Sequence, residues 1–433
     1  MKRYIAFVLS LLLCCISCAE YPTGECQSNS ETVTDNNGDS LVHKKYSAVN
    51  YSYMKAMWIS QYDLYNVLTV NGRQRSKGDF TRLVCTMLDN VKALGINTVI
   101  VQVRPFGDSF YPSEHYPMSS YAVGAYGNSS DYDAFETIVT QAHIRGLSIH
   151  AWINPLRAMT EAEILRIDDD YAIRRWYEEK NGEYIVKVGE RLYLNPAYEE
   201  TRRLVCDGIS EIIELYNVDG IHIDDYFYPT TDKSFDEKIY SEYIKNGGEK
   251  SLDEFRREQI NMLIKEIYST VKHENESILF GVSPSGVMKN NYELLYADVS
   301  YWCAREGYLD YICPQVYWGM EHETYDFVSV CQTFDEMIKV DGIKLVIGMT
   351  VSKAKTGYDQ YAGTGQWEWR DHQDILYRCL QHTLTLKHCA GVSYFCYQYF
   401  YDPQTGESLE ETEAERNLFV PLLKKIQWNT TIS

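Results

Sequence analysis

The chain has 433 residues, with 41 Lys and Arg against 61 Asp and Glu, which gives a formal net charge of −20. This charge argues against a nucleic-acid partner or an anionic membrane surface, because the phosphates of both repel an acidic protein. Hydrophobic residues make up 45% of the chain, which is enough to bury a sizeable core. The 37 tyrosines exceed ordinary usage and are expected either in the core or on a ligand surface.

The amino terminus has the pattern of an export signal. Lys2 and Arg3 precede a run of about 12 apolar residues, which suits a secretory signal and is too short to span a bilayer. The segment Cys15-Ile16-Ser17-Cys18 resembles a bacterial lipobox, although Cys15 stands where Leu is usual. We therefore predict a signal segment at 1–18, lipidation of Cys18 and an exported lipoprotein of the cell envelope, held to the membrane only by its lipid. The alternative is an ordinary signal peptide cleaved near Ala19.

Residues 19–50 are predicted to form a polar tether, since the stretch to about Tyr46 is rich in Asn, Ser, Thr and Asp and lacks periodicity. The remaining residues, 51–433, are predicted to form one domain. Their cysteines lie mostly within apolar patterns and show neither CxxC nor Cys/His zinc spacing, so we expect buried thiols.

Eight β-rich runs follow one another along the domain. We predict strands at Ala56–Tyr62, Thr98–Arg104, Ser148–Asn154, Gly220–Tyr226, Ile278–Pro284, Tyr311–Tyr317, Lys344–Met349 and Gly391–Gln398. Helical apolar stripes lie between them, for example Phe80, Leu83, Val84, Met87, Leu88, Val91 and Leu94. This alternation predicts the α/β class and a single (β/α)8 barrel with long loops. A doubly wound open sheet is the alternative, but no Gly-rich phosphate loop follows the first strand.

The carboxyl ends of the strands should carry the chemistry in such a barrel. Alternation along each strand predicts which side chains face inward. These are expected to form a sugar-binding rim of amides, a guanidinium and aromatic rings: Trp58, Arg104, Trp152, Asn154, Tyr226, Gln315, Tyr317, Trp318 and Gln398. Tyr394 is also expected to face inward and Tyr228 to lie in a rim loop, whereas a satisfied core hydrogen bond is the alternative role for any single polar residue.

Carboxylates near the rim are candidates for glycosidase chemistry, which needs one carboxylic acid and one carboxylate. Asp224 is the first candidate, as nucleophile or base. Asp225 follows directly, and a regular strand would aim it at the opposite face, so it reaches the same bond only if the loop turns back. Glu321 is the other candidate for the acid. Arg104 is expected to keep Asp224 ionised, with a structural ion pair as the alternative.

His222 and Asp224 also present two metal ligands on one strand face, so a metal-dependent hydrolase is an alternative. The glycosidase hypothesis itself needs no cofactor. Its partner would be a glycan, and the sequence gives no indication of oligomeric state.

Several motifs together resemble the glycosyl-hydrolase-like family 10. The most specific is Asp219-Gly220-Ile221-His222-Ile223-Asp224-Asp225-Tyr226-Phe227-Tyr228-Pro229. The others are Gln102-Val103-Arg104-Pro105, Ala151-Trp152-Ile153-Asn154-Pro155 with Arg157, Tyr193-Leu194-Asn195-Pro196-Ala197 with Arg202, Gly281-Val282-Ser283-Pro284-Ser285-Gly286 and Asp310-Tyr311-Ile312-Cys313-Pro314-Gln315-Val316-Tyr317-Trp318. They run in order from about Lys55 to Gln398.

This resemblance implies an envelope glycoside hydrolase on a TIM barrel, and at least one member of the family is described as cleaving peptidoglycan glycan strands stripped of peptides. The family usually has Ser-Pro-Phe-Gly where this chain has Ser285 in place of Phe, which implies an altered sugar platform. Barrel enzymes of the α-amylase type carry a Glu acid at strand five, and this chain has none before Glu293. The function predicted is therefore a glycosidase acting on denuded glycan strands, and the second hypothesis is a catalytically inactive, carbohydrate-binding barrel.

Overall fold

The computed structural model describes residues 46–179, 183–427 and 430–431. The predicted signal segment, Cys18 and most of the predicted tether lie outside these residues. The compact unit that carries the fold begins at Ser47. Ala48 and Asn50, which were predicted to belong to the tether, are buried within this unit.

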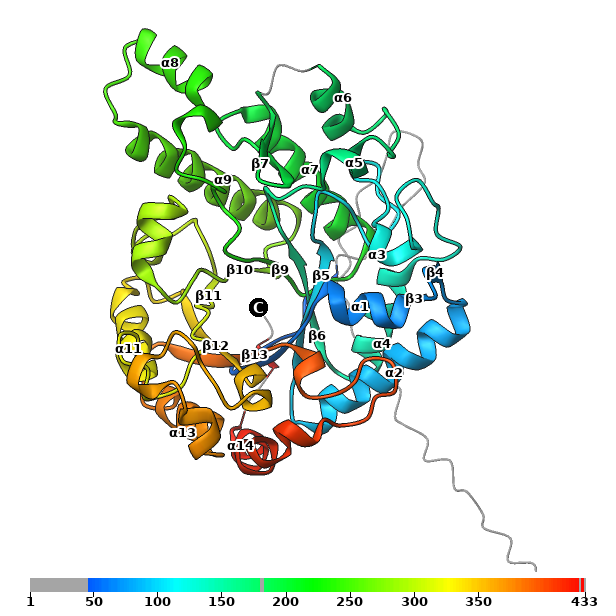
Figure 1. The fold of residues 1–433 in the computed structure, drawn as a ribbon, viewed down its shortest axis with the longest axis vertical. Helices are drawn as coiled ribbons and strands as arrows, with labels where there is room; N and C mark the ends of the chain where they lie inside the picture. The colour runs from blue at the N-terminus through cyan, green and yellow to red at the C-terminus, as the bar shows by residue number, and fades with distance from the viewer. Residues whose placement is uncertain (1–45, 180–182, 428–429, 432–433) are drawn as a thin grey trace, which may run out of the picture. The chain divides into compact units, whose positions relative to one another are not determined.

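Eight parallel strands close into a barrel whose order around the ring follows the chain (Figure 1). The strands are β2 (Met54–Ile59), β5 (Thr98–Arg104), β6 (Ser148–Ile153), β9 (Gly220–Ile223), β10 (Leu279–Val282), β11 (Tyr311–Ile312), β12 (Lys344–Thr350) and β13 (Cys389–Phe395). The predicted (β/α)8 barrel is confirmed. β5 has the predicted bounds, whereas β9 and β11 end earlier than predicted, so the residues after them lie in loops at the barrel mouth.

Helices surround the barrel (Figure 1). They are α1 (Gln61–Leu68), α2 (Lys77–Ala93), α3 (Ser120–Val123), α4 (Ala134–Ile144), α5 (Glu161–Ile164), α6 (Ala172–Glu178), α7 (Glu199–Leu215), α8 (Glu237–Lys245), α9 (Leu252–Glu274), α10 (Val299–Cys303), α11 (Phe327–Met337), α12 (Glu368–Asp371), α13 (Ile375–Thr383) and α14 (Glu413–Lys425). The apolar stripe predicted at 80–94 is the buried face of α2. Within the described ranges, every helix is too short or too polar to cross a bilayer.

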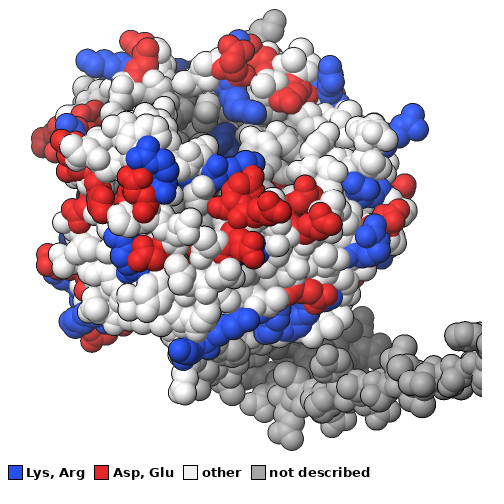
Figure 2. All heavy atoms as spheres, turned by 60° about the horizontal axis from the view of Figure 1, so that its bottom comes forward, with Lys and Arg blue, Asp and Glu red and all other residues white. Residues whose placement is uncertain are grey.

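Short elements complete the fold. The 3-10 helices are Lys233–Phe235, Ser352–Lys355, Gly363–Gly365, Tyr397–Tyr399 and Glu410–Thr412, and Asn290–Leu294 is π-helical. Two-stranded antiparallel sheets pair β1 (Asn50–Tyr51) with β14 (Thr430–Thr431), β3 (Thr69–Val70) with β4 (Arg73–Gln74), and β7 (Ile185–Val188) with β8 (Arg191–Leu194). On the face drawn in Figure 2, acidic and basic side chains are interspersed among uncharged ones.

The barrel interior is filled by aromatic and histidine rings. The hydroxyl of Tyr311 lies 2.9 Å from Nδ1 of His150 and 2.7 Å from Nδ1 of His222. Burial lowers the pKa of His150 to about 4, so that its ring is neutral. Gly281 makes room for Tyr311, because a Cβ at Gly281 would lie 1.9 Å from the Tyr311 ring. His222 therefore belongs to a packed layer within the barrel.

Candidate active site

A small pocket opens at the carboxyl ends of the strands, where barrel enzymes carry their chemistry. Its volume is about 150 Å³. Trp58, Trp152, Asp224, Tyr226, Gln315 and Tyr317 line it at the inward positions predicted for them, together with Ser60, Gln61, Tyr62, Gln102, Arg157, Asp225 and Phe395. Polar amides and carboxylates thus face a cavity walled by aromatic rings, which is the composition expected of a sugar site.

Both consecutive aspartates line this pocket. β9 ends at Ile223, so Asp224 and Asp225 lie beyond the regular strand. The backbone then turns sharply, with the N–H of Phe227 donating to the carbonyl of Asp225 at 3.0 Å. Strand alternation therefore does not apply at Asp225, and its side chain reaches the same cavity as Asp224.

A relay of amides holds Asp224. The backbone N–H of Gln61 donates to Oε1 of Gln102 at 2.8 Å, and Nε2 of Gln102 donates to Oδ1 of Asn154 at 2.6 Å. These bonds point the amino group of Asn154 at Asp224, where Nδ2 lies 2.5 Å from Oδ1 and 2.7 Å from Oδ2. Asn154 itself is buried behind the carboxylate, so its role in this structure is to position Asp224.

The cation beside the aspartates is Arg157, which comes from the loop after β6. Its guanidinium lies over the ring of Tyr226 at 3.7 Å and over that of Phe106 at 4.5 Å. The Nε of Arg157 also donates to the carbonyl of Pro105 at 3.2 Å. The family motif Ala151–Pro155 with Arg157 singled out Arg157 in the sequence. The alternation of side chains along strands could not predict where Arg157 points, because this residue lies in a loop.

Arg104 does not face the pocket, and the predicted orientation is wrong. The register of β5 against β6 shifts between Gln102 and Arg104, so the side chain of Arg104 turns outward. Its guanidinium lies 4.3 Å from the ring centre of Tyr116, and a Cβ at Gly208 of α7 would lie 2.2 Å from Nη1. Since the β-bulge inserts one extra residue, inward and outward positions exchange beyond it.

Side chains alternate along β13, but which of them face inward is the opposite of the prediction. Tyr394 packs on Phe419 of α14 with ring centres 5.0 Å apart, so the prediction that it faces inward is wrong. Its neighbours Ser393 and Phe395 face inward instead: Ser393 accepts a hydrogen bond from Nε1 of Trp58 at 3.0 Å. Gln398 does not line the pocket but borders it, with Nε2 at 3.5 Å from Oγ of Ser60.

Three other predicted rim residues lie outside the pocket lining. Trp318 packs against His322, with ring centres 5.6 Å apart. Tyr228 is buried against Tyr296. The side chain of Glu321 is 52% exposed and lies 3.6 Å from Nε2 of His372, so this structure keeps the predicted acid candidate away from the two aspartates.

The two aspartates titrate as a pair. Burial and the charge of Asp225 raise the pKa of Asp224 to about 7, against the lowering effects of Arg157 and the Asn154 amide. Burial also raises the pKa of Asp225, and a hydrogen bond from Gln315 acts in the opposite direction. Neighbouring carboxylates in a buried site resist double ionisation, so the two aspartates titrate as a coupled pair and the last proton is lost at a higher pH than from an isolated carboxyl. One carboxylate and one carboxylic acid are the two groups that glycoside hydrolysis requires.

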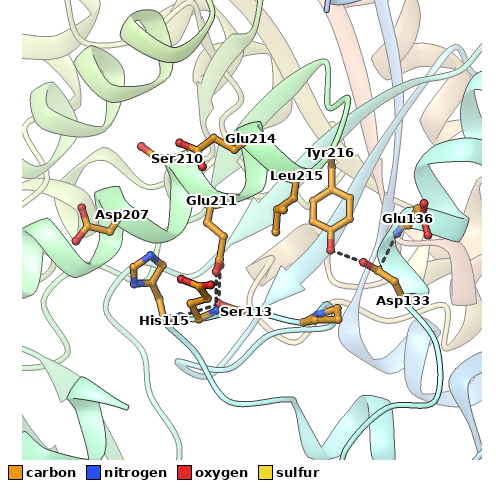
Figure 3. A pocket seen from close by; sticks show the side chains of 12 residues that line it. Ser113, His115, Asp133, Glu136, Asp207, Ser210, Glu211, Glu214, Leu215 and Tyr216 are labelled. Carbon is orange, nitrogen blue, oxygen red and sulfur yellow. Dashed lines mark hydrogen bonds between the residues drawn. The ribbon is translucent and has the colours of Figure 1, made fainter. Parts of the chain in front are cut away.

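A larger cavity of about 850 Å³ lies elsewhere, between α7, the start of α4 and residues 112–115 (Figure 3). Glu211 points at Ser113 and accepts a hydrogen bond from its hydroxyl at 2.5 Å. Asp133 accepts a hydrogen bond from the hydroxyl of Tyr216 at 2.5 Å. These carboxylates tie loops to the helix layer. The cavity lies away from the strand ends, so we do not assign it as the active site.

No metal centre is evident at the barrel mouth of the described chain. The described residues that could together hold an ion are Asp168, Asp169 and Asp170, which are all exposed and outside the pocket. The Nδ1 of His222 already contacts Tyr311, and its ring lies edge-on to Trp58. The Nε2 of His222 has no hydrogen-bond partner, but among the described residues no third His, Cys or carboxylate joins His222 and Asp224 in a group that could hold an ion.

A protein-family match covers most of the barrel. Residues 53–362 match the family Glycosyl hydrolase-like 10, a range that includes β2 to β12 and both aspartates. The chain belongs to this family. Its membership supports a glycosidase function for the barrel.

Similar proteins are described as glycosyl hydrolases. Glycosyl hydrolase YngK of Bacillus subtilis is 31% identical over 71% of this chain, which spans 62% of that protein's length. Glycosyl hydrolase DigH of Escherichia coli O6:H1 is 28% identical over 76% of this chain and 78% of its own. The glycoside hydrolase domain of PgaB from Bordetella bronchiseptica has the same fold, with a TM-score of 0.52, 12% identity, and coverage of 85% of this chain and 99% of that domain.

Ser285, where the family resemblance led us to expect Phe, forms a turn after β10. Its hydroxyl accepts the N–H of Val287 at 3.2 Å, and its carbonyl accepts Nδ2 of Asn291 at 2.8 Å. The pocket of this Glycosyl hydrolase-like 10 member nevertheless keeps aromatic walls, from Trp58, Trp152, Tyr317 and Phe395.

The raised pKa of Asp224 has a consequence for stability. Its pKa rises from 3.8 to about 7 on folding, so the folded state binds the proton more tightly and the stability of the wild type falls as pH rises from about 4 to about 7. Asp224→Asn lacks this titration. We expect it to unfold at higher urea concentration than the wild type at about pH 8, by on the order of 2–4 kcal/mol, and the difference to vanish near pH 4. A difference independent of pH would contradict this prediction.

Arg157 should set the pH range of activity. Its positive charge lowers the pKa of both aspartates. We expect Arg157→Gln to move the whole profile of kcat/KM to higher pH by about one unit, and Arg157→Lys, which keeps the charge, to move it less. Rates measured from about pH 5 to about pH 9 test this. An unmoved profile, or a shift to lower pH, would show that Arg157 does not act on the pair.

Proposed function

We propose that this protein hydrolyses O-glycosidic bonds of a bacterial polysaccharide, and that its substrate is the glycan strand of peptidoglycan stripped of peptides. The observation that carries the proposal is the pair of carboxyl groups, Asp224 and Asp225, in one pocket with aromatic walls at the barrel mouth. Asp224, whose two oxygens face the amino group of Asn154, serves as the carboxylate, and the more exposed Asp225 serves as the acid. The raised pKa belongs to the coupled pair and does not assign the proton to Asp224. Glu321 is not assigned a catalytic role.

The charge distribution supports a neutral or amino-sugar glycan. A net charge of −20 disfavours strongly acidic polymers, although Arg157 offsets it at the pocket. We also propose that the chain is exported and anchored through a lipid on Cys18, which would place the barrel beside the cell wall. Membership of the Glycosyl hydrolase-like 10 family supports the reaction class.

The experiment compares two substrates: glycan strands freed of peptides by an amidase, and intact peptidoglycan. New reducing ends and soluble oligosaccharides are measured with the purified protein. We expect release from the denuded strands and much less from the intact wall. Retention of denuded strands on the protein without new reducing ends would instead favour a carbohydrate-binding barrel, and equal release from both substrates would refute the preference for denuded strands.

A further inference from the structure

The two carboxyl groups of the pocket come from consecutive residues. Among its lining residues, Asp224 and Asp225 are the ones with carboxylates. Two carboxylates that act on opposite faces of a sugar stand about 5–5.5 Å apart in retaining enzymes and about 6.5–9.5 Å apart in inverting enzymes. Here both arise from consecutive positions in one turn after β9, and both line the cavity. This origin favours two groups working on the same side of the sugar, which leaves the opposite face without a nucleophile from the protein.

The surroundings of the two groups differ. Asp224 is 2% exposed, and both of its oxygens face the amino group of Asn154, so it is fixed in orientation. Asp225 is less buried and contacts Gln315. A fixed and buried carboxylate suits the orientation of a ligand N–H, whereas a more accessible carboxyl suits the exchange of protons with a leaving group and with water.

We propose that the nucleophile is the carbonyl oxygen of the substrate's own 2-acetamido group, so that the pocket takes a 2-acetamido-2-deoxy sugar at the cleaved bond. This inference rests on the proposed function and names its chemistry. Asp224 accepts the acetamido N–H and holds the group beneath the anomeric carbon. Asp225 is the general acid and then the general base. Neither aspartate forms a bond to the sugar.

The steps balance without a further reactant. In the first, the acetamido oxygen bonds to the anomeric carbon, the glycosidic bond breaks, and the leaving oxygen takes the proton of Asp225. The resulting oxazolinium ion is stabilised by the negative charge of Asp224 on its N–H. In the second, Asp225 removes a proton from water, the water oxygen bonds to the anomeric carbon, and the bond to the acetamido oxygen breaks. Two displacements at one carbon retain its configuration.

The walls of the pocket suit an acetamido methyl group. Trp58 and Trp152 meet edge to face with centres 4.7 Å apart, and Tyr317 stacks on Phe395 at 5.4 Å. All four rings line the cavity beside the two aspartates. Burial of a methyl group between such rings is favourable, and a sugar without an N-acetyl group would offer neither that contact nor a nucleophile.

The kinetic test uses denuded glycan strands that have been de-N-acetylated and then re-N-acylated with acetyl, fluoroacetyl or trifluoroacetyl groups. Fluorine withdraws electrons from the attacking carbonyl oxygen. We expect kcat/KM to fall steeply along the series, by at least about tenfold per step, and free-amine strands to resist cleavage, because the barrier rises with each loss of nucleophilicity. Equal rates along the series would overturn the proposal.

A binding test separates this inference from the proposed function. The thiazoline derived from N-acetylglucosamine mimics the oxazolinium ion. Calorimetry measures its affinity for the protein whether or not the protein cleaves any glycan strand. We expect it to bind the wild type and Glu321→Gln equally and to bind Asp224→Asn at least about tenfold more weakly. If the wild type cleaves no strand but binds the thiazoline in this pattern, the proposed substrate is wrong and the inference holds. Failure of the wild type to bind the thiazoline would overturn the inference alone.

Discussion

Asp224→Asn is expected to lower kcat/KM on denuded glycan strands by about 10²- to 10⁴-fold. Asn has nearly the shape of Asp and can keep a hydrogen bond to Asn154, but it carries no negative charge for the developing positive charge of the sugar. The measurement is the initial rate of new reducing ends at a fixed pH, with circular dichroism to show that the variant is folded.

Glu321→Gln is the matched control, because Glu321 was the alternative acid and the structure places it on the surface away from the pocket. Its kcat/KM should remain within about twofold of the wild type, as for an ordinary exposed substitution. If Asp224→Asn retains wild-type activity, or if both variants lose the same large factor, the assignment of the pocket as the active site is refuted.

Asp225→Asn is expected to lose a similar factor on glycan strands, but much less on a substrate whose leaving group needs no proton. The leaving sugar oxygen must be protonated as the bond breaks, and general acid catalysis contributes about 10²- to 10⁴-fold to such a step. The nitrophenolate leaving group of an aryl glycoside departs without that proton. The kcat/KM of Asp225→Asn on such a substrate should therefore fall by only about tenfold or less. The comparison of the two substrates with the wild type and the variant is the measurement.

Asp224→Asn supplies the contrast for this prediction. The negative charge of Asp224 stabilises the sugar and not the leaving group. The kcat/KM of Asp224→Asn should therefore fall by a large factor on both substrates. Equal losses on both substrates for Asp225→Asn would contradict its role as the acid.

Sequence periodicity sufficed for the barrel, because strands and helices of different hydrophobic period alternate regularly. It also placed Trp58, Gln315 and Tyr317 at the pocket, since Trp58 lies in β2 and the chain beyond β11 continues along the barrel through bridges of Gln315 to Ser285 and Gly348. The β-bulge in β5 could not be predicted from alternation, and it turned Arg104 outward. Alternation also gave the wrong direction for Asp225, because β9 ends before this residue. The direction of its side chain is set by the turn after β9 and not by the pleat of the strand.

Loop residues were the second class that periodicity could not place. Arg157 reaches the aspartates because its guanidinium stacks on Phe106 and Tyr226, contacts that join segments far apart in the chain. The tyrosines singled out in the sequence fall into two groups. Tyr226 and Tyr317 line the pocket, whereas Tyr228 and Tyr394 pack in the core.

The central claim is that a glycosidic bond is cleaved beside Asp224 and Asp225, and a crystal structure of Asp224→Asn with a denuded glycan oligosaccharide tests it most directly. We predict a sugar ring between Tyr317 and Tyr226, with the scissile oxygen within about 3.2 Å of a carboxyl oxygen of Asp225. An oligosaccharide bound in another cavity, such as the one lined by Glu211, with the pocket at the barrel mouth empty, would contradict the claim.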